Sequence, residues 1–148
     1  MSKERKELGL RAEQRVIKKM GSSVITIEDR SRIYPDFSFE LMGGVGDSYA
    51  VEVKTMKGVY EGEKVGMIGI SKEEFNAYEE LSKRYMVLVV VEIRPRGYHW
   101  SKYLHYIVEW ISIRDRYYET KPNNLRLSLW WVLSNGTKLE DWIKLVYS

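Results

Sequence analysis

A carboxylate and an ammonium group lie two residues apart in one short predicted strand, residues 49–55. Successive side chains of a strand point to opposite faces, so Glu52 and Lys54 share one face and the intervening valines share the other. Such a pair can bind a cation or place charge beside an anionic substrate. A solvated strand surface is the simpler alternative for these two residues taken alone.

The preceding predicted strand, residues 34–41, brings a second carboxylate to the same face. Its phenylalanines alternate with acidic and hydroxyl side chains, among them Asp36. The glycine-rich segment 43–47 predicts a turn, so the two strands are expected to form a hairpin. The register that buries the phenylalanines also puts Asp36 on the face of Glu52 and Lys54. Opposed or diagonal Cβ atoms are roughly 5–8 Å apart, so the two carboxylates need a positive charge between them.

A third carboxylate, Glu13, projects from a predicted first helix, residues 3–20. Its apolar stripe consists of Leu8, Ala12, Val16 and Met20. Glu13 falls inside the apolar arc, where a carboxylate is costly unless it is paired or bound to metal. A side chain that reaches solvent from the edge of the stripe is the alternative. Glu40 and Asp47 are alternative acidic residues for this site, but Asp47 is expected to form part of the turn.

The first two thirds of the chain predict the order helix, three strands, helix and strand, with one further short strand that leads into the second helix. The elements are a helix at 3–20, strands at 23–27, 34–41 and 49–55, a short strand at 66–70, a helix from Ser71 and a strand at 86–93, with loops at 28–32 and 56–63. Ser71 and Glu74 form a capping box, which marks the start of the second helix. Residues 86–93 form an apolar run suited to a strand covered on both faces.

The last part of the chain, residues 94–148, contains all five tryptophans. Residues 104–111 and 125–133 are predicted strands, the first with a helical alternative, and a capping box at 137–140 predicts a last helix. We interpret this part as an extension of the core or a homodimer interface. The alternative is a base-stacking surface, with phosphates held by Arg94, Arg96, Arg114, Arg116 and Arg126.

Composition favours an ordinary globular protein, with 44% hydrophobic and 30% charged residues. No apolar run reaches the ~18 residues that a membrane span needs, and the first residues lack a signal-peptide core. The absence of cysteine excludes disulfides and thiolate metal sites. We therefore expect an intracellular, cytoplasmic protein with no membrane partner. His99 and His105 lie in no metal-ligand spacing, and each is expected to be an ordinary exposed or packed residue.

The whole set of features resembles the PD-(D/E)XK nuclease superfamily. It comprises the helix with Glu13, the pair Pro35-Asp36, the triplet Glu52-Val53-Lys54, and the helix and strand that follow. The pattern is most similar to small archaeal Holliday-junction-resolvase-like and restriction-endonuclease-like members. The resemblance implies an α/β (α+β) restriction-endonuclease-like core with a mixed central sheet. It also implies one domain over residues 1–148, with a core at about 5–93 and an aromatic-rich C-terminal extension at about 94–148.

The resemblance also implies a metal site. Asp36 and Glu52 would bind Mg²⁺ or Mn²⁺, together with the backbone carbonyl of Val53 and with Glu13 directly or through water. Lys54 would orient the attacking water or stabilise charge on the phosphate. Neighbouring carboxylates favour its protonated form, so we prefer the electrostatic role. The implied activity is metal-dependent hydrolysis of DNA phosphodiester bonds, by an endonuclease or an exonuclease.

Basic residues beside these groups are candidates for DNA contact. Arg11 and Arg15 lie on the predicted polar side of the first helix, and Lys57 follows the strand with Glu52. A solvated surface is the alternative, because a net charge of +3 permits a polyanionic partner without requiring one. Cutting both strands of a duplex or a junction would need two active sites, which suggests a homodimer. Two other functions stay open: a non-catalytic nucleic-acid-binding module, and a protein-interaction module that acts through the tryptophan-rich part.

Overall fold

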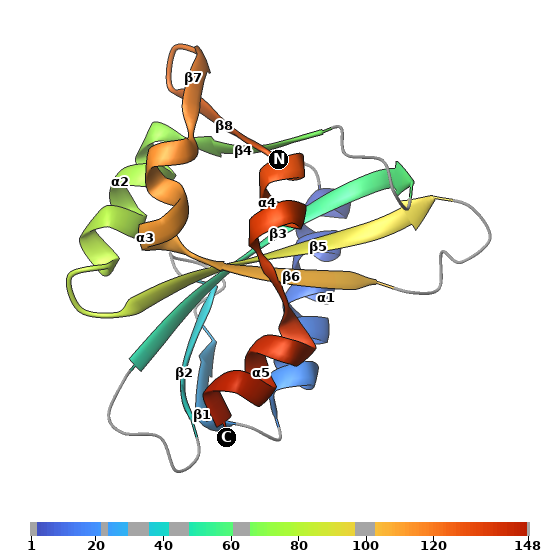
Figure 1. The fold of residues 1–148 in the computed structure, drawn as a ribbon, viewed down its shortest axis with the longest axis vertical. Coiled ribbons are helices and arrows are strands. Elements are labelled where there is room, and N and C mark those ends of the chain that lie inside the picture. The colour runs from blue at the N-terminus through green and yellow to red at the C-terminus, as the bar shows by residue number, and fades with distance from the viewer. Residues whose placement is uncertain are drawn as a thin grey trace.

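The computed structural model describes residues 3–21, 24–29, 36–41, 48–60, 66–96 and 103–147. Within them a six-stranded sheet runs through the molecule in the order β1-β2-β3-β5-β6-β9 (Figure 1). The strands are β1 (Val24–Asp29), β2 (Phe37–Leu41), β3 (Ser48–Tyr60), β5 (Met86–Arg96), β6 (Leu104–Glu109) and β9 (Thr137–Lys138). Only the central pair, β3 with β5, is parallel in this sheet as described. The sheet is therefore mixed, as expected.

Helices cover both faces of this sheet and create two apolar cores. The helices are α1 (Lys3–Met20), α2 (Lys72–Leu81), α3 (Trp110–Ile113), α4 (Leu129–Asn135) and α5 (Leu139–Tyr147). Helices α1 and α5 pack on the face that carries Val51 and Leu88. Helices α2, α3 and α4 pack on the face that carries Ala50 and Val89. Strands β3 and β5 are thus covered on both sides, which explains the unbroken apolar run of β5.

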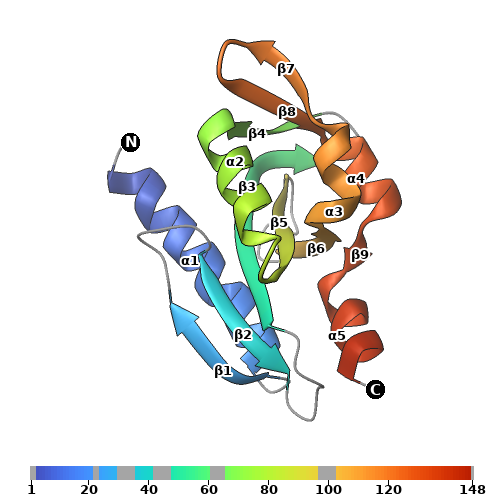
Figure 2. The same cartoon turned by 90° about the vertical axis from the view of Figure 1, so that its left-hand side faces the viewer.

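A second, smaller sheet has the order β4-β8-β7. It consists of β4 (Met67–Ser71), β7 (Tyr118–Lys121) and β8 (Asn124–Ser128), and the short 3-10 helix Arg114–Arg116 precedes β7. The β7–β8 hairpin projects at the top of Figures 1 and 2. Strand β4 leads directly into α2, whose N-terminus is closed by the predicted capping box of Ser71 and Glu74. This small sheet therefore supports the start of α2.

The register of the β2–β3 hairpin is one that the alternation predicts. Phe37 lies opposite Val51, and Phe39 lies opposite Tyr49. Val51 and Tyr49 lie on the face covered by α1. The predicted loop at 56–63 is wrong for residues 56–60, because β3 continues to Tyr60 alongside β5. Likewise β1 extends to Asp29 into the predicted loop at 28–32.

Three C-terminal predictions are corrected. The predicted strand 104–111 ends at Glu109, and α3 begins at Trp110. The predicted strand 125–133 ends at Ser128, and α4 begins at Leu129. The buried residues of α4, Leu129 and Val132, are three positions apart, a spacing that brings side chains together on a helix and to opposite faces on a strand. Thr137, the predicted cap of the last helix, belongs to β9.

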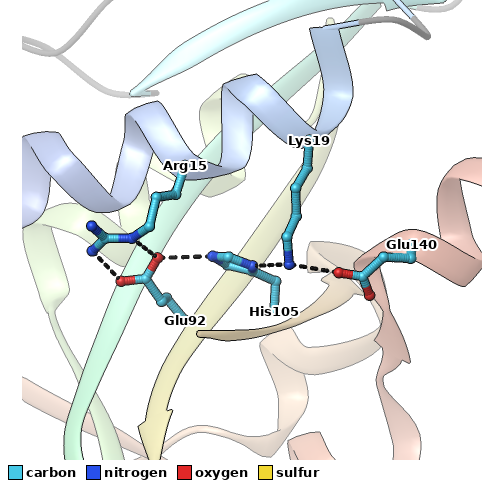
Figure 3. Close-up of polar contacts among 5 residues, drawn as sticks. All are labelled: Arg15, Lys19, Glu92, His105 and Glu140. Carbon is cyan, nitrogen blue, oxygen red and sulfur yellow. Dashed lines mark hydrogen bonds and ion pairs between the residues drawn. The ribbon is translucent and has the colours of Figure 1, made fainter. Parts of the chain in front are cut away.

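A chain of five charged and polar side chains fastens α1 to the sheet and to α5 (Figure 3). Arg15 donates two hydrogen bonds to Glu92, at 2.9 and 2.7 Å, and His105 Nε2 lies 2.8 Å from the same carboxylate. Lys19 Nζ lies 2.5 Å from His105 Nδ1 and 2.5 Å from Glu140. An ammonium group only donates, so Nδ1 accepts and Nε2 carries the proton that binds Glu92. The network fixes the position of α1, the helix that carries Glu13.

None of the helices in the described ranges is long and apolar enough to cross a lipid bilayer.

Candidate active site

Asp36 lies immediately before β2 and reaches across to β3. Continuing the register beyond the pair Phe37–Val51 puts Asp36 opposite Glu52. Its carboxylate accepts the backbone N–H of Val53 at 2.7 Å. The described pairing of β2 with β3 ends at Val51, so Asp36 satisfies a backbone donor just beyond the ladder. This bond holds the carboxylate against the middle of β3.

Glu52 and Lys54 both face α2, on the side of the sheet opposite α1. Glu52 is only 2% exposed, and its Oε2 lies 3.2 Å from the hydroxyl of Tyr78. Its other oxygen, Oε1, is buried without a hydrogen-bond partner. Lys54 is half-buried and donates to Glu74 at 2.5 Å. The strand alternation thus places a carboxyl group and an ammonium group side by side, as the sequence predicts.

Burial makes Glu52 a weak acid. Desolvation, followed by the charge of Asp36, raises the pKa of Glu52 to about 9, against the opposing effects of Lys54 and the Tyr78 hydroxyl. Burial likewise raises the pKa of Tyr78 above its ordinary value, so the phenol is neutral. At neutral pH Glu52 therefore holds a proton unless a cation replaces it.

Asp36 interacts with each of the other predicted site residues. Burial raises its pKa, while the Val53 N–H, hydrogen bonds with Glu13 and Glu52, and the charge of Lys54 act in the opposite direction. Glu13 is half-buried on α1, at the edge of the helix face that packs on the sheet. The structure therefore brings Glu13, Asp36, Glu52 and Lys54 together.

The three residues predicted to contact DNA do not share one environment in the structure. Arg11 is exposed on α1. Arg15 was expected on a solvated face of α1, but it pairs with Glu92, and its guanidinium lies 3.8 Å from the ring centroid of Tyr103. A long side chain at the edge of a helix stripe can turn inward to reach a buried carboxylate. The side chain of Lys57 lies outside the described residues.

Other parts of the sequence motif also lie outside the described residues. These are Pro35, Asp47 and the side chain of Glu40. Of the tryptophans, Trp110 is fully buried and Trp142 nearly so, which agrees with packing, whereas Trp130 is 44% exposed. His105 is buried in the network of Figure 3, as a packed residue, and His99 is outside the described ranges.

The donor set at Asp36 and Glu52 suits a hard divalent cation. Carboxylate and carbonyl oxygens are the ligands of Mg²⁺, which keeps several of its waters and uses one or two carboxylates. The buried, unpartnered Oε1 of Glu52 is a free ligand position in a cluster that already has excess acidic groups. In the described part of the chain, no group of three or more His, Asp or Glu residues could hold a metal ion. The residues present therefore fit an ion held by two carboxylates better than a closed protein cage.

Two residues of this site, Glu74 and Tyr78, do not follow from the sequence motif. Glu74 is explained locally by the capping box, and Tyr78 by the apolar stripe of α2. Both project from α2 toward β3, and the Tyr78 hydroxyl lies 3.1 Å from Glu74. The sequence contains one feature that could have identified them. Two polar side chains lie four residues apart on the inner face of a helix, where each needs a buried hydrogen-bond partner.

Replacing Glu52 with Gln is expected to stabilise the metal-free protein. Between the ordinary pKa of 4.5 and the folded value of about 9, the folded state holds more protons on Glu52 than the unfolded state, so stability falls as pH rises. Glutamine does not titrate, so Glu52→Gln should be more stable in EDTA at pH 7 by roughly 1–3 kcal/mol. Urea unfolding from pH 5 to 9 measures this difference, with the exposed Glu73→Gln as control. An unchanged pH slope in Glu52→Gln would contradict the assignment.

This chain is similar to a known protein in its fold. No protein-family model matches the chain, and no curated protein is significantly similar to it. Among solved structures, it is similar to Hjc from Archaeoglobus fulgidus, a Holliday junction resolvase from an archaeal hyperthermophile. The TM-score is 0.59 at 15% sequence identity, over 92% of this chain and 95% of the resolvase. The two proteins share a fold.

Proposed function

We propose that the protein is a metal-dependent nuclease that hydrolyses phosphodiester bonds of DNA. The observation that carries the proposal is the buried cluster in which Glu52 has a free oxygen beside Asp36, with Lys54 on the same face of β3. The fold shared with a Holliday junction resolvase supports this function and favours branched DNA as the substrate. Burying acidic groups without a cation is costly, so their collection at one point argues for a function.

The chain offers a consistent set of cation ligands. Asp36 and Glu52 would hold Mg²⁺ or Mn²⁺, with the Val53 carbonyl and Glu13 as further donors. A residue in a strand presents its N–H and C=O to the same side, and the Val53 N–H faces Asp36, so its carbonyl opens toward the same carboxylate. When bound, the ion supplies Lewis-acid polarisation of a phosphate oxygen and neutralises charge on the leaving oxygen.

The protein groups contribute charge and position. Glu52 would have to release its proton to hold a cation, so we expect cation binding to strengthen as pH rises toward about 9. The ammonium of Lys54 would stabilise negative charge on the phosphate. Arg11, exposed on the helix that carries Glu13, and Lys57 are proposed contacts to the DNA backbone. A homodimer would supply two such sites for two cuts.

Cleavage of a panel of DNA substrates tests the proposal. Supercoiled plasmid, linear duplex and a four-way junction are incubated with Mg²⁺ or Mn²⁺, with EDTA as the blank. We expect cleavage by the native protein and a loss of about 10²-fold or more in Lys54→Met, which keeps most of the length of the side chain and removes its charge. Lys83→Met, an exposed lysine on the segment after α2, is the matched control. Binding without cleavage would favour the non-catalytic alternative and contradict the nuclease.

A further inference from the structure

The carboxylate of Glu74 takes part both in the capping box of α2 and in the contact with Lys54. Its Oε1 accepts the backbone N–H of Ser71 at 3.2 Å, as one half of the capping box that begins α2. Its Oε2 accepts the ammonium of Lys54 at 2.5 Å and lies 3.1 Å from the Tyr78 hydroxyl. Glu74 is half-buried, with 17% of its side chain exposed. One carboxylate therefore fixes both the helix start and the lysine.

This bond decides where the ammonium of Lys54 lies. The charge of Lys54 lowers the pKa of both Asp36 and Glu52, so each of these groups attracts the ammonium when it is ionised. Nevertheless, among the described residues the lysine donates to Glu74, and no hydrogen bond joins it to either of the other two. Burial disfavours the charged form of Glu74, but Lys54 and the Ser71 N–H outweigh burial and lower its pKa. Glu74 is thus an anion that holds the lysine on the α2 side of the cluster.

We propose that Glu74 is a positioning residue that holds Lys54 away from Asp36 and Glu52, leaving those two carboxyl groups to a divalent cation. This inference rests on the proposed function and assigns a role to a residue outside the superfamily motif. Without the negative charge of Glu74, the ammonium turns to Asp36 and Glu52 and competes with the cation for the same oxygens. Tyr78, within hydrogen-bond distance of both Glu52 and Glu74, keeps the two carboxyl groups side by side.

Glu74→Gln separates the positioning role from the role in the helix cap. Glutamine also serves as the partner in a capping box, so the start of α2 is retained while the charge is lost. Glu73→Gln is the matched control, one residue earlier on the same helix and exposed. We expect Glu74→Gln to bind Mn²⁺ at least fivefold more weakly by calorimetry and to lower kcat tenfold or more with little change in KM. Glu73→Gln should leave both quantities unchanged.

A double-mutant cycle with Lys54→Met isolates the competition. If Lys54 competes with the cation once it is released, Glu74→Gln weakens Mn²⁺ binding by a smaller factor in the Lys54→Met background than in the native one. An equal factor in both backgrounds would mean that Glu74 acts on the cation by its own charge alone, which would overturn the proposal.

The side-chain NMR signal of Lys54 supplies a readout that requires neither metal nor cleavage. In the metal-free protein, the Cε and Nζ resonances of Lys54 should shift in Glu74→Gln and stay in place in Glu73→Gln. A shift would support the Lys54–Glu74 contact even if the native protein cut no DNA, a result that would defeat the proposed function alone. Unshifted resonances in Glu74→Gln, with cleavage intact in the native protein, would overturn the positioning role and leave the nuclease standing.

Discussion

Asp36→Asn is expected to lower the rate of metal-dependent DNA cleavage by roughly 10³-fold. The amide oxygen of asparagine can still accept the Val53 N–H, so the local backbone is preserved. The negative charge that a divalent cation needs is lost, however, and Glu52 alone does not replace it. Single-turnover cleavage of end-labelled four-way junction DNA at saturating Mn²⁺ measures the rate.

Asp141→Asn provides the control for this experiment, because Asp141 is exposed on α5. It should cleave at the native rate. DNA affinity measured in EDTA should change little in either variant, since Asp36 is proposed to hold the cation and not the DNA. Cleavage by Asp36→Asn at the native rate would remove Asp36 from the chemistry.

Glu92→Ala is expected to cost about 3 kcal/mol of unfolding free energy at pH 7. The change leaves His105 and Arg15 without their shared carboxylate, and His105 is buried. Arg15 is partly exposed and can turn to water, so we place the cost at the lower end of the range for a broken buried pair. Urea denaturation measures it, with the surface variant Glu80→Ala expected to change stability by less than about 0.5 kcal/mol.

The same pair predicts a pH dependence. Arg15 and His105 outweigh burial and hold the pKa of Glu92 below its usual 4.5. The stabilisation is therefore present above about pH 4.5 and is lost as pH falls through the lower, folded-state pKa. The difference in stability between the native protein and Glu92→Ala should shrink in acid. A difference that stays constant from pH 7 to pH 3 would contradict the role of the ionised carboxylate.

The alternation of side chains was sufficient to predict the candidate site. Any register that buries both the phenylalanines of β2 and the valines of β3 puts Asp36 on the face of Glu52. In the structure that register brings Asp36 opposite Glu52. Glu13, predicted inside the apolar arc of α1, lies half-buried at the edge of the packed face. Faces are predictable in this way because burial is a local constraint with a period of two residues in a strand and 3.6 in a helix.

Partners across long sequence separations were not predictable in this way. Arg15 and Glu92 are 77 residues apart, and Lys54 and Glu74 are 20 apart. A helix pattern identifies the buried face but not the strand residue that meets it. The C-terminal helices α3 and α4 were missed because their short apolar runs satisfy a strand or a helix equally well.

Diffraction from a crystal soaked in Mn²⁺, recorded to give an anomalous difference map, examines the proposed site most directly. We expect one strong peak about 2.0–2.3 Å from a carboxylate oxygen of Asp36 and from Oε1 of Glu52, the oxygen that is otherwise buried without a partner. The absence of a peak between these two carboxylates at saturating Mn²⁺, or binding only elsewhere on the protein, would contradict the metal-dependent nuclease.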